Sequence, residues 1–328
     1  MKRRDVIRLL GGAAMWPLTA RAQQGGRVRR IGVFHPGTAD DPEYEARNAA
    51  FLQALGQLGW IVGRNVRVDF RWGAGDVKRY RAIAEELVAV TPDVILGNGT
   101  AVVSALQEAT RTVPIVFANI GDPVGSGLVA SLPHPGGNAT GFISIELGFG
   151  GKWVALLKEI APRVTRVAVM RDSAISTQIG LLGGMQSVAP ALGMELRPVD
   201  LRDADEIERA IGAFAREPNG GLIVVGAARA VLHSKLIVTL AARNRLPAVY
   251  PFRHFVAGGG LVSYGADTIH VYQQAAGYVD RILKGEKAAD LPVQTPTKYE
   301  LVINLRTASA LALDVPVTLL ARADEVIE

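Results

Sequence analysis

Polar side chains that follow hydrophobic runs are the residues of this sequence with the clearest capacity for chemistry. Each lies where a predicted β-strand ends, and in parallel sheets such ends share the edge at which ligands bind. Taken singly, each residue is better explained by turn formation; taken together, they favour a cleft for a small polar ligand. The set comprises His35, Thr38, Asn98, Thr100, Asn119, Asp122, Arg171, Ser173, Arg229, Tyr264 and Asp267.

The stretch IVFANIGDPVGSGLV at 115–129 contains a possible nucleotide-binding turn. Gly125, Gly127 and Ala130 match the G-x-G-x-x-A fingerprint of dinucleotide-binding folds. That fingerprint requires its first glycine at the strand end, but a segment of five residues intervenes, and Asp122 within it would repel a pyrophosphate. The pattern therefore argues against nucleotide binding and for a tight turn at the lip of a ligand cleft.

No catalytic or metal-binding constellation occurs in the sequence. There is no GxxxxGK[ST] phosphate loop, no GxSxG elbow and no HExxH zinc motif. The aspartates at 200–205 lack the glycine and distal glutamate of a calcium loop. We expect no cofactor, no metal and no enzymatic activity, and we interpret the histidines as surface or loop residues. They are His35, His134, His233, His254 and His270.

The first 22 residues have the composition of a secretory leader. A basic start at 2–4 precedes a moderately apolar run at 6–18, and the ARA triplet at 20–22 is a small-residue cleavage signal. The two arginines at 3–4 favour the twin-arginine route, the alternative being an ordinary leader that begins with two arginines. No cysteine is present to carry a lipid after cleavage. We therefore expect a periplasmic protein, cleaved after Ala22 and without a membrane anchor.

The net charge of +5 is concentrated in this leader. Five basic residues and one acidic residue between positions 1 and 22 account for +4 of it, which leaves about +1 for the mature chain. No basic stripe remains to attract a nucleic acid. The absence of cysteine also excludes disulfides, so packing and hydrogen bonds must stabilise the exported protein.

Strand-like and helix-like segments alternate along the rest of the chain. With 328 residues and 49% hydrophobic content, the sequence is long enough for about two domains. Alternating apolar residues at 66–72 predict a strand, whereas helical spacing at 43–58 predicts a helix. The alternation indicates two α/β halves built from βαβ units. We expect strands at 28–34, 65–72, 93–96, 115–117 and 140–143, then at 164–170, 195–199, 222–225, 247–250, 260–264 and 298–304.

A helix predicted at 269–283 comes after the second sheet, and we expect it to pack back on the first. The lobes would then be discontinuous in sequence. The expected fold class is α/β, two Rossmann-like lobes with parallel sheets joined by a multi-strand hinge. We assign residues 1–22 to the cleaved signal peptide, 27–144 and 264–290 to lobe 1, and 145–263 and 291–328 to lobe 2.

Several runs resemble one known family along essentially the whole chain. They include LGWIVGRNVRVDFRWGAGD at 58–76, TRTVPIVFANIGDPVGSGLVASLPHPGGNATGF at 110–142, KWVALLKEIAPRVTRVAVMRD at 152–172 and LPAVYPFRHFVAGGGLVSYG at 246–265. These are similar to ABC-transporter substrate-binding proteins of the type I periplasmic-binding fold, in a proteobacterial branch with twin-arginine leaders. The resemblance implies two lobes, a three-stranded hinge, a small-molecule ligand, a membrane permease as partner and a monomeric receptor.

The resemblance also implies that the strand-end residues named above face the ligand. Some relatives bind aromatic amino acids and carry a Thr-Asp-Asn-like triplet at a strand end of the second lobe, where this chain has GAAR at 226–229. The acid that would meet an amino group is missing there, which argues against an amino-acid ligand. We expect Arg171 or Arg229 to pair with a ligand carboxylate, and Phe252 or Tyr264 to form an apolar wall.

The expected function is therefore that of a periplasmic solute receptor of an ABC importer, which grips a small carboxylate-bearing ligand between its lobes. A ligand sensor that presents its closed form to a signalling receptor is the first alternative, and an exported enzyme is the second. A repressor of similar fold is excluded by the leader and by the lack of an N-terminal DNA-binding helical unit.

Overall fold

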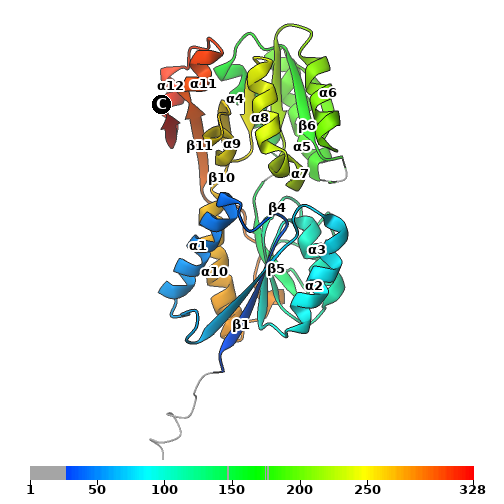
Figure 1. The fold of residues 1–328 in the computed structure, drawn as a ribbon, viewed down its shortest axis with the longest axis vertical. Coiled ribbons are helices and arrows are strands. Elements are labelled where there is room, and N and C mark those ends of the chain that lie inside the picture. Colours follow the sequence, from blue (N-terminus) through cyan, green and yellow to red (C-terminus); the bar gives the residue numbers. More distant parts are fainter. Residues whose placement is uncertain (1–26, 146–147, 174, 176) are drawn as a thin grey trace, which may run out of the picture.

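The structure is built around two mainly parallel β-sheets (Figure 1). It is a computed structural model that describes residues 27–145, 148–173, 175 and 177–328; the predicted leader and its cleavage site lie outside the described residues. The strands β3, β5 and β8, defined below, are buried along their whole length, as expected of parallel sheets covered by helices on both faces. The predicted fold class, two α/β lobes with mostly parallel sheets, is confirmed.

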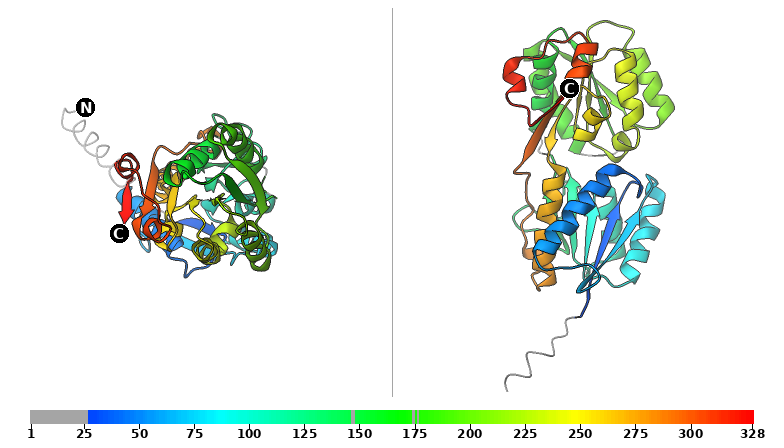
Figure 2. Two further views of the ribbon diagram at one scale, coloured as in Figure 1. Left: turned by 90° about the horizontal axis from the view of Figure 1, so that it is seen from above. Right: turned by 60° about the vertical axis from the view of Figure 1, so that its left-hand side comes forward.

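The first sheet has the strand order β2-β1-β3-β4-β5, and all its strands are parallel. Helices α1 and α10 cover one face, and α2 and α3 cover the other. The right-hand view of Figure 2 shows α1 and α10 side by side along this lobe. The elements are β1 (Arg29–His35), α1 (Pro42–Gln57), β2 (Val66–Trp72), α2 (Tyr80–Ala89), β3 (Val94–Asn98), α3 (Thr100–Ala109), β4 (Ile115–Ile120), β5 (Ala139–Ile143) and α10 (Thr268–Leu283).

The second sheet has the order β12-β11-β10-β9-β8-β6-β7, with β10 and β11 antiparallel. Helices α4, α5, α11 and α12 pack on one face, and α6, α7, α8 and α9 pack on the other. The strands are β6 (Arg166–Arg171), β7 (Glu195–Asp200), β8 (Gly220–Val224), β9 (Ala248–Tyr250), β10 (Val262–Ala266), β11 (Tyr299–Asn304) and β12 (Glu325–Ile327). The helices are α4 (Phe149–Ile160), α5 (Thr177–Val188), α6 (Ala204–Phe214), α7 (Ala228–Leu232), α8 (Ser234–Arg243), α9 (Arg253–Ala257), α11 (Leu305–Ala310) and α12 (Val317–Leu320).

Helix α10 returns from the second lobe to the core of the first. Its residues Tyr272, Ala275 and Val279 are fully buried against the first sheet and α1. Its Asp280 accepts a 2.8 Å hydrogen bond from the indole nitrogen of Trp60, in the loop after α1. Because of this return, the chain crosses between the lobes after β5, between β10 and α10, and again before β11. These crossings correspond to the multi-strand hinge predicted from the sequence.

Two of the predicted lobe boundaries need correction. Residues 264–266 were assigned to lobe 1, but they belong to β10, which pairs with β9 and β11 in the second sheet. Residues 291–294 were assigned to lobe 2, but Leu291 is buried in the first core and Gln294 donates its backbone N–H to Gly141 in β5. A proline at 292 does not prevent this pairing, because the neighbouring residues supply the N–H groups.

Local details also differ from the sequence prediction. The helix expected at 231–243 is two helices, α7 and α8, which meet at His233. The glycine-rich stretch after β4 forms turns and opens no helix. Strand β12 was not predicted, because three residues at the end of a chain carry too little periodicity to be recognised.

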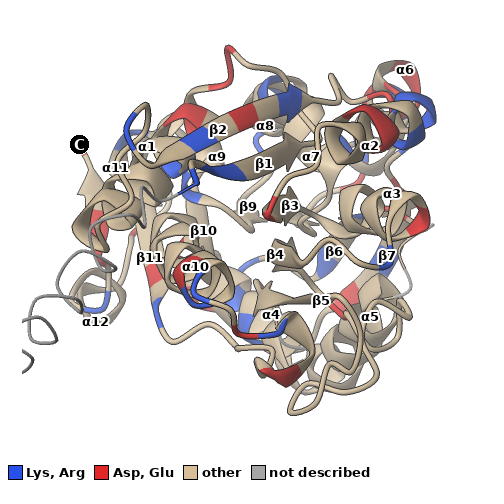
Figure 3. Ribbon diagram, turned by 90° about the horizontal axis from the view of Figure 1, so that it is seen from below, with Lys and Arg blue, Asp and Glu red and all other residues tan. Residues whose placement is uncertain are grey.

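Basic and acidic residues are interspersed along the ribbon (Figure 3). On β2, Asp69 lies 2.6 Å from Arg30 and 3.2 Å from Arg67. The hydrogen bond from Arg30 is the main reason why the pKa of Asp69 lies below its ordinary value. The two signs are mixed along β2 rather than segregated.

Gly141 provides a test of the close approach between β4 and β5. Its φ is 152°, and a Cβ there would overlap the backbone oxygen of Phe117. We expect Gly141→Ala to lower the free energy of unfolding by about 2 kcal/mol or more, because the strands must separate. Gly212→Ala is the matched control, since nothing lies within 4 Å of its Cβ position in α6. That helical change should be neutral or stabilising by up to about 1 kcal/mol. Urea denaturation would measure both, and equal effects would contradict the prediction.

Candidate ligand site

The carboxyl ends of the two sheets face each other across the space between the lobes. In α9, His254 Nδ1 lies 3.9 Å from Oε2 of Glu43 in α1. A Cβ placed on Gly75, which follows β2, would lie 3.3 Å from Leu232 of α7. A Cβ on Gly121, which follows β4, would lie 3.3 Å from the hydroxyl of the first residue of α5. Helix α1 and the turns after β2 and β4 in one lobe therefore approach α9, α7 and α5 of the other lobe.

Asn119 near the end of β4 combines a strained backbone with an unsatisfied side chain. Its φ of 58° lies in the left-handed region, and the register with β5 shifts between Phe117 and Ile120. Its Nδ2 donates a 2.8 Å hydrogen bond to Oδ1 of Asn98, at the end of β3. Its own Oδ1 is buried and has no hydrogen-bond partner in the described part of the chain. Strain and unpaired polar atoms concentrate at functional sites, so Asn119 is the strongest candidate in lobe 1.

His35 lies beneath this edge rather than on it. Its ring is fully buried, with Nε2 2.8 Å from Oδ1 of Asn48, and it packs against Tyr44, Trp72 and Tyr272. Burial lowers the pKa of His35 to about 4, so the imidazole is neutral at neutral pH. The interpretation of His35 as a surface or loop histidine is wrong, because aromatic side chains cover the end of this central strand. His35 therefore packs beneath the candidate site and does not line it.

Two arginines follow strands of the second lobe, and they differ in their partners. Nε of Arg171, at the end of β6, is buried without a hydrogen-bond partner among the residues described. Arg229 at the start of α7 is engaged, since its Nη1 lies 3.2 Å from the backbone oxygen of Leu201 and 3.5 Å from Oδ1 of Asp172. Of the two arginines predicted to meet a ligand anion, Arg171 is therefore the better placed.

The hinge side of the site carries His254 and Glu300. Both ring nitrogens of His254 are buried without hydrogen-bond partners in the described ranges. Burial and the nearby Arg47 lower the pKa of His254 to about 3, so its 3.9 Å approach to Glu43 is no ion pair at neutral pH. Burial, reinforced by Asp267, raises the pKa of the Glu300 carboxyl to about 7. His254 was predicted to be a surface or loop histidine; its buried nitrogens contradict that interpretation.

Two predicted site residues of lobe 1 make local turns. Oδ1 of Asp122 accepts a 2.7 Å hydrogen bond from the backbone N–H of Gly125. That N–H is one that a pyrophosphate would need, so the geometry agrees with the argument against nucleotide binding. Thr38 is exposed, and its hydrogen bond is the main reason why the pKa of Asp40 is lowered.

Two predicted residues of the second half have capping and pairing roles. Ser173 donates both its backbone N–H and its hydroxyl to Asp200, each at 2.8 Å. Asp267 caps α10 by accepting from the backbone N–H of His270 at 3.0 Å, and it pairs with Lys298 at 2.8 Å. These contacts satisfy the side chains internally.

The remaining predicted residues lie at or near the facing edges. Thr100 is half-buried as the first residue of α3. Phe252 precedes α9, and its ring would lie 3.1 Å from a Cβ on Gly226, at the end of β8. Tyr264 stacks on Phe149 with ring centroids 5.1 Å apart, so part of its ring belongs to the lobe 2 core.

Several residues that shape this site were not recognised in the sequence. Tyr44 and Arg47 lie one turn apart in α1, and Arg47 bonds Glu43 at 3.4 Å. Gln178 in α5 is buried; it accepts from the backbone of Asp172 and donates to the backbone of Gly226, at 2.7 and 3.1 Å. They lie on helices rather than at strand ends, so the strand-end pattern could not find them. A glutamine at a buried helical position was the available signal.

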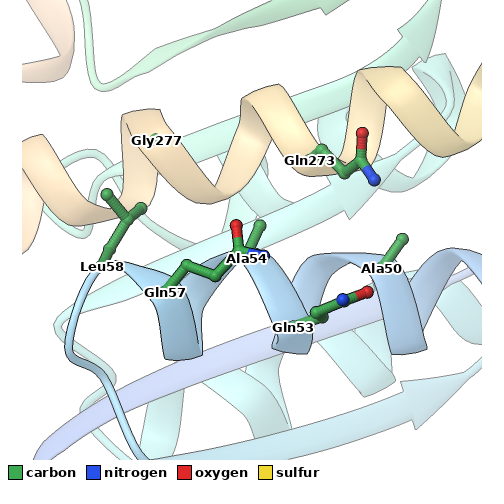
Figure 4. A pocket seen from close by; sticks show the side chains of 7 residues that line it. All are labelled: Ala50, Gln53, Ala54, Gln57, Leu58, Gln273 and Gly277. Carbon is green, nitrogen blue, oxygen red and sulfur yellow. The ribbon is translucent and has the colours of Figure 1, made fainter.

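A groove of about 400 Å³ lies elsewhere, between α1 and α10 (Figure 4). Alanine and glycine let the two helices approach, and glutamine side chains border the opening. Its lining residues are Ala50, Gln53, Ala54, Gln57, Leu58, Gln273 and Gly277. None of the predicted site residues lines it, so we do not assign the ligand to it.

Comparison with known proteins places this geometry among solute-binding proteins. The family model described as ABC transporter substrate binding protein matches residues 37–327. A tyrosine-binding protein of Clostridioides difficile (strain R20291) is 26% identical over 289 residues, which covers 87% of this chain and 81% of the relative.

Solved structures agree on the fold. A conserved domain protein from Vibrio cholerae O1 biovar eltor has a TM-score of 0.84 and 27% identity, covering 92% of this chain and 100% of that one. A Streptococcus pneumonia ABC domain in complex with L-Trp also has a TM-score of 0.84, at 24% identity, covering 91% of this chain and 99% of that one. Among the residues that the structure describes, no helix has the length and apolar character needed to span a bilayer.

The buried His35 predicts a loss of stability in acid. The folded protein binds a proton on His35 at a pKa of about 4, whereas an unfolded chain binds it at about 6.5. The unfolded state therefore holds more protons between these values, and the stabilisation present above pH 6.5 is lost as the pH falls toward 4. We expect His35 to contribute about 3 kcal/mol to this loss. Denaturation from pH 7 to 4 should show a shallower loss for His35→Phe than for the exposed-site control His134→Gln. Equal pH slopes would contradict the assignment.

Proposed function

The chain belongs to the family of ABC transporter substrate-binding proteins, and on that premise we propose that it is a periplasmic receptor for a small carboxylate-bearing solute. The ligand would bind between the lobes and be delivered to the membrane permease of an ABC importer. The exported location rests on the leader-like composition of residues 1–22.

The proposal for a carboxylate rests on Arg171, whose Nε is buried without a hydrogen-bond partner among the described residues. A buried donor of this kind is costly unless a ligand supplies an acceptor. The planar guanidinium presents paired N–H donors that match the two oxygens of a carboxylate. Arg229 would contribute less, because Asp172 and the backbone of Leu201 already accept from it. Phe252, which is half-buried beside Gly226, would form an apolar wall.

The receptor would act because the ligand binds its closed form more tightly than its open form. A ligand held by Arg171 of lobe 2 and Asn119 of lobe 1 stabilises the form in which both contacts are made. The turns at Gly75 and Gly121, which approach α7 and α5 of the other lobe, would form the rim of that closed form. The permease would then recognise the closed arrangement of the lobes.

Substitution of Arg171 tests the carboxylate contact. We expect Arg171→Gln to weaken binding of the cognate carboxylate by roughly tenfold to a hundredfold, because a charge-assisted hydrogen bond is lost. Arg209→Gln on the exposed face of α6 is the control for charge, and it should bind as the wild type does. Native mass spectrometry of freshly purified protein would identify a retained ligand, and isothermal titration would measure the affinities.

The titration panel should include L-tyrosine and L-tryptophan, since relatives are named for binding them, together with carboxylates paired with their uncharged amides. Tight binding restricted to uncharged or cationic compounds would contradict the proposal. Equal affinities of Arg171→Gln and the wild type for the carboxylate would contradict it as well.

A further inference from the structure

A histidine of lobe 2 is buried where α9 approaches lobe 1. The ring of His254 stacks on Phe252 and Phe255, with centroids 5.8 and 4.5 Å apart. Its Nδ1 lies 3.9 Å from Oε2 of Glu43 in α1, so lobe 1 contributes to its burial. Neither ring nitrogen has a hydrogen-bond partner among the described residues. Polar atoms that lose water without gaining a partner cost free energy, so this ring opposes the contact between the lobes.

The lobe 1 surface opposite the ring already carries an ion pair. Arg47 is buried in α1, and its Nη2 lies 3.4 Å from Oε2 of Glu43, the same oxygen that approaches His254. Its Nε donates to the hydroxyl of Thr268 at 3.2 Å, which holds the guanidinium in place. Burial and, after it, the charge of Arg47 lower the pKa of His254 to about 3. A protonated His254 would add a second cation to this buried contact, which therefore suits only the neutral imidazole.

A second titratable group at this junction acts in the opposite sense. Burial, and then Asp267, raise the pKa of Glu300 to about 7, and Glu43 of lobe 1 raises it further. Because closure brings Glu43 toward Glu300, closure favours protonation of Glu300, whereas it disfavours protonation of His254. The charged residues at or near the junction are Glu43, Arg47, Arg253, Asp267, Lys298, Glu300 and Glu325.

We propose that His254 is a pH-sensitive latch between the lobes, whose imidazole must be neutral for α9 to pack against α1. Opening of the lobes returns the ring to water, where it takes up a proton in a mildly acidic medium, and closing expels that proton. Acid thus favours the open form, and neutral pH permits closure. The inference concerns closure itself and holds whichever solute binds.

The size of the effect follows from proton binding in the two forms. The open form binds a proton on His254 at the ordinary pKa of 6.5, whereas the closed form binds it at about 3. Between these values the open form holds more protons, so the ratio of open to closed protein rises as the pH falls. From pH 7.5 to 5.5 we expect a rise of roughly tenfold.

A disulfide that holds the lobes together provides the direct test. The chain has no cysteine, and a Cβ on Gly121 would lie 3.3 Å from Oγ1 of Thr177 in the other lobe. Gly121→Cys with Thr177→Cys should therefore lock the closed form on oxidation. In an NMR titration of the histidine rings, with His254→Phe to assign the signal, His254 should titrate near pH 6.5 in the reduced protein and stay neutral at pH 5 in the oxidised one. The exposed His134 is the internal control and should titrate identically in both.

Single-molecule FRET measures the consequence for the lobes of the solute-free protein. The labels are placed on Ala82→Cys in α2 and Arg209→Cys in α6, two exposed positions on opposite lobes. His254→Phe keeps an aromatic ring that cannot be protonated, so it should abolish the tenfold rise in the ratio of open to closed protein. Glu300→Gln should retain the rise, because its own titration opposes it. Circular dichroism at pH 5.5 distinguishes opening from unfolding.

Three results would overturn the inference. They are identical titration of His254 in the oxidised and reduced proteins, an open-to-closed ratio that is constant or falls in acid, and an equal rise in His254→Phe. A falling ratio would mean that protonated His254 pairs with Glu43 across the lobes. Failure of Arg171→Gln to weaken carboxylate binding would contradict the proposed function and leave the latch standing, because neither measurement uses a solute.

Discussion

The return of α10 to the first sheet is the constraint on which the rest of the structure depends. Tyr272, Ala275 and Val279 can leave water only by packing against α1 and the first sheet, after the second lobe has already begun. That packing makes the chain cross between the lobes three times. The crossings hold the carboxyl edges of both sheets opposite each other, which neither sheet could achieve alone. The candidate ligand site is therefore a consequence of where one amphipathic helix is buried.

The facing edges contain polar atoms that the described residues leave unpaired. Asn119 Oδ1, Arg171 Nε and both nitrogens of His254 are buried without partners. Other side chains at these edges form hydrogen bonds within the protein. Asp122 accepts from its own turn, Ser173 donates to Asp200, and Asp267 caps the N-terminus of α10. The distinction separates residues that build the turns from residues that are available to a solute. It also spreads the available groups over both lobes, which is what ligand-driven closure requires.

The sequence was sufficient for the architecture because strands buried on both faces and helices with one apolar face leave strong periodic signals. It was also sufficient to locate the strand ends, including Asn119 and Arg171. It could not rank them, since turn formation and ligand contact favour the same residue types. His35 and His254 were misjudged because the surroundings of a histidine depend on distant elements. Tyr272 stacks on His35, and Arg47 of the other lobe lowers the pKa of His254. Gln178 and Tyr44 contribute from helices, where no local pattern marks a residue that reaches a strand end.

Beneath the lobe 1 edge of the candidate site, burial holds Tyr44 and His35 uncharged at neutral pH, and Asn119 donates to Asn98 through a neutral amide. A carboxylate in place of Asn119 would be a stronger acceptor, but it would repel the ligand anion that we assign to Arg171 and would be costly to desolvate as the lobes close. An oriented amide accepts a hydrogen bond without adding charge. In the proposed receptor, the attraction of the anion is left to Arg171 of the opposite lobe.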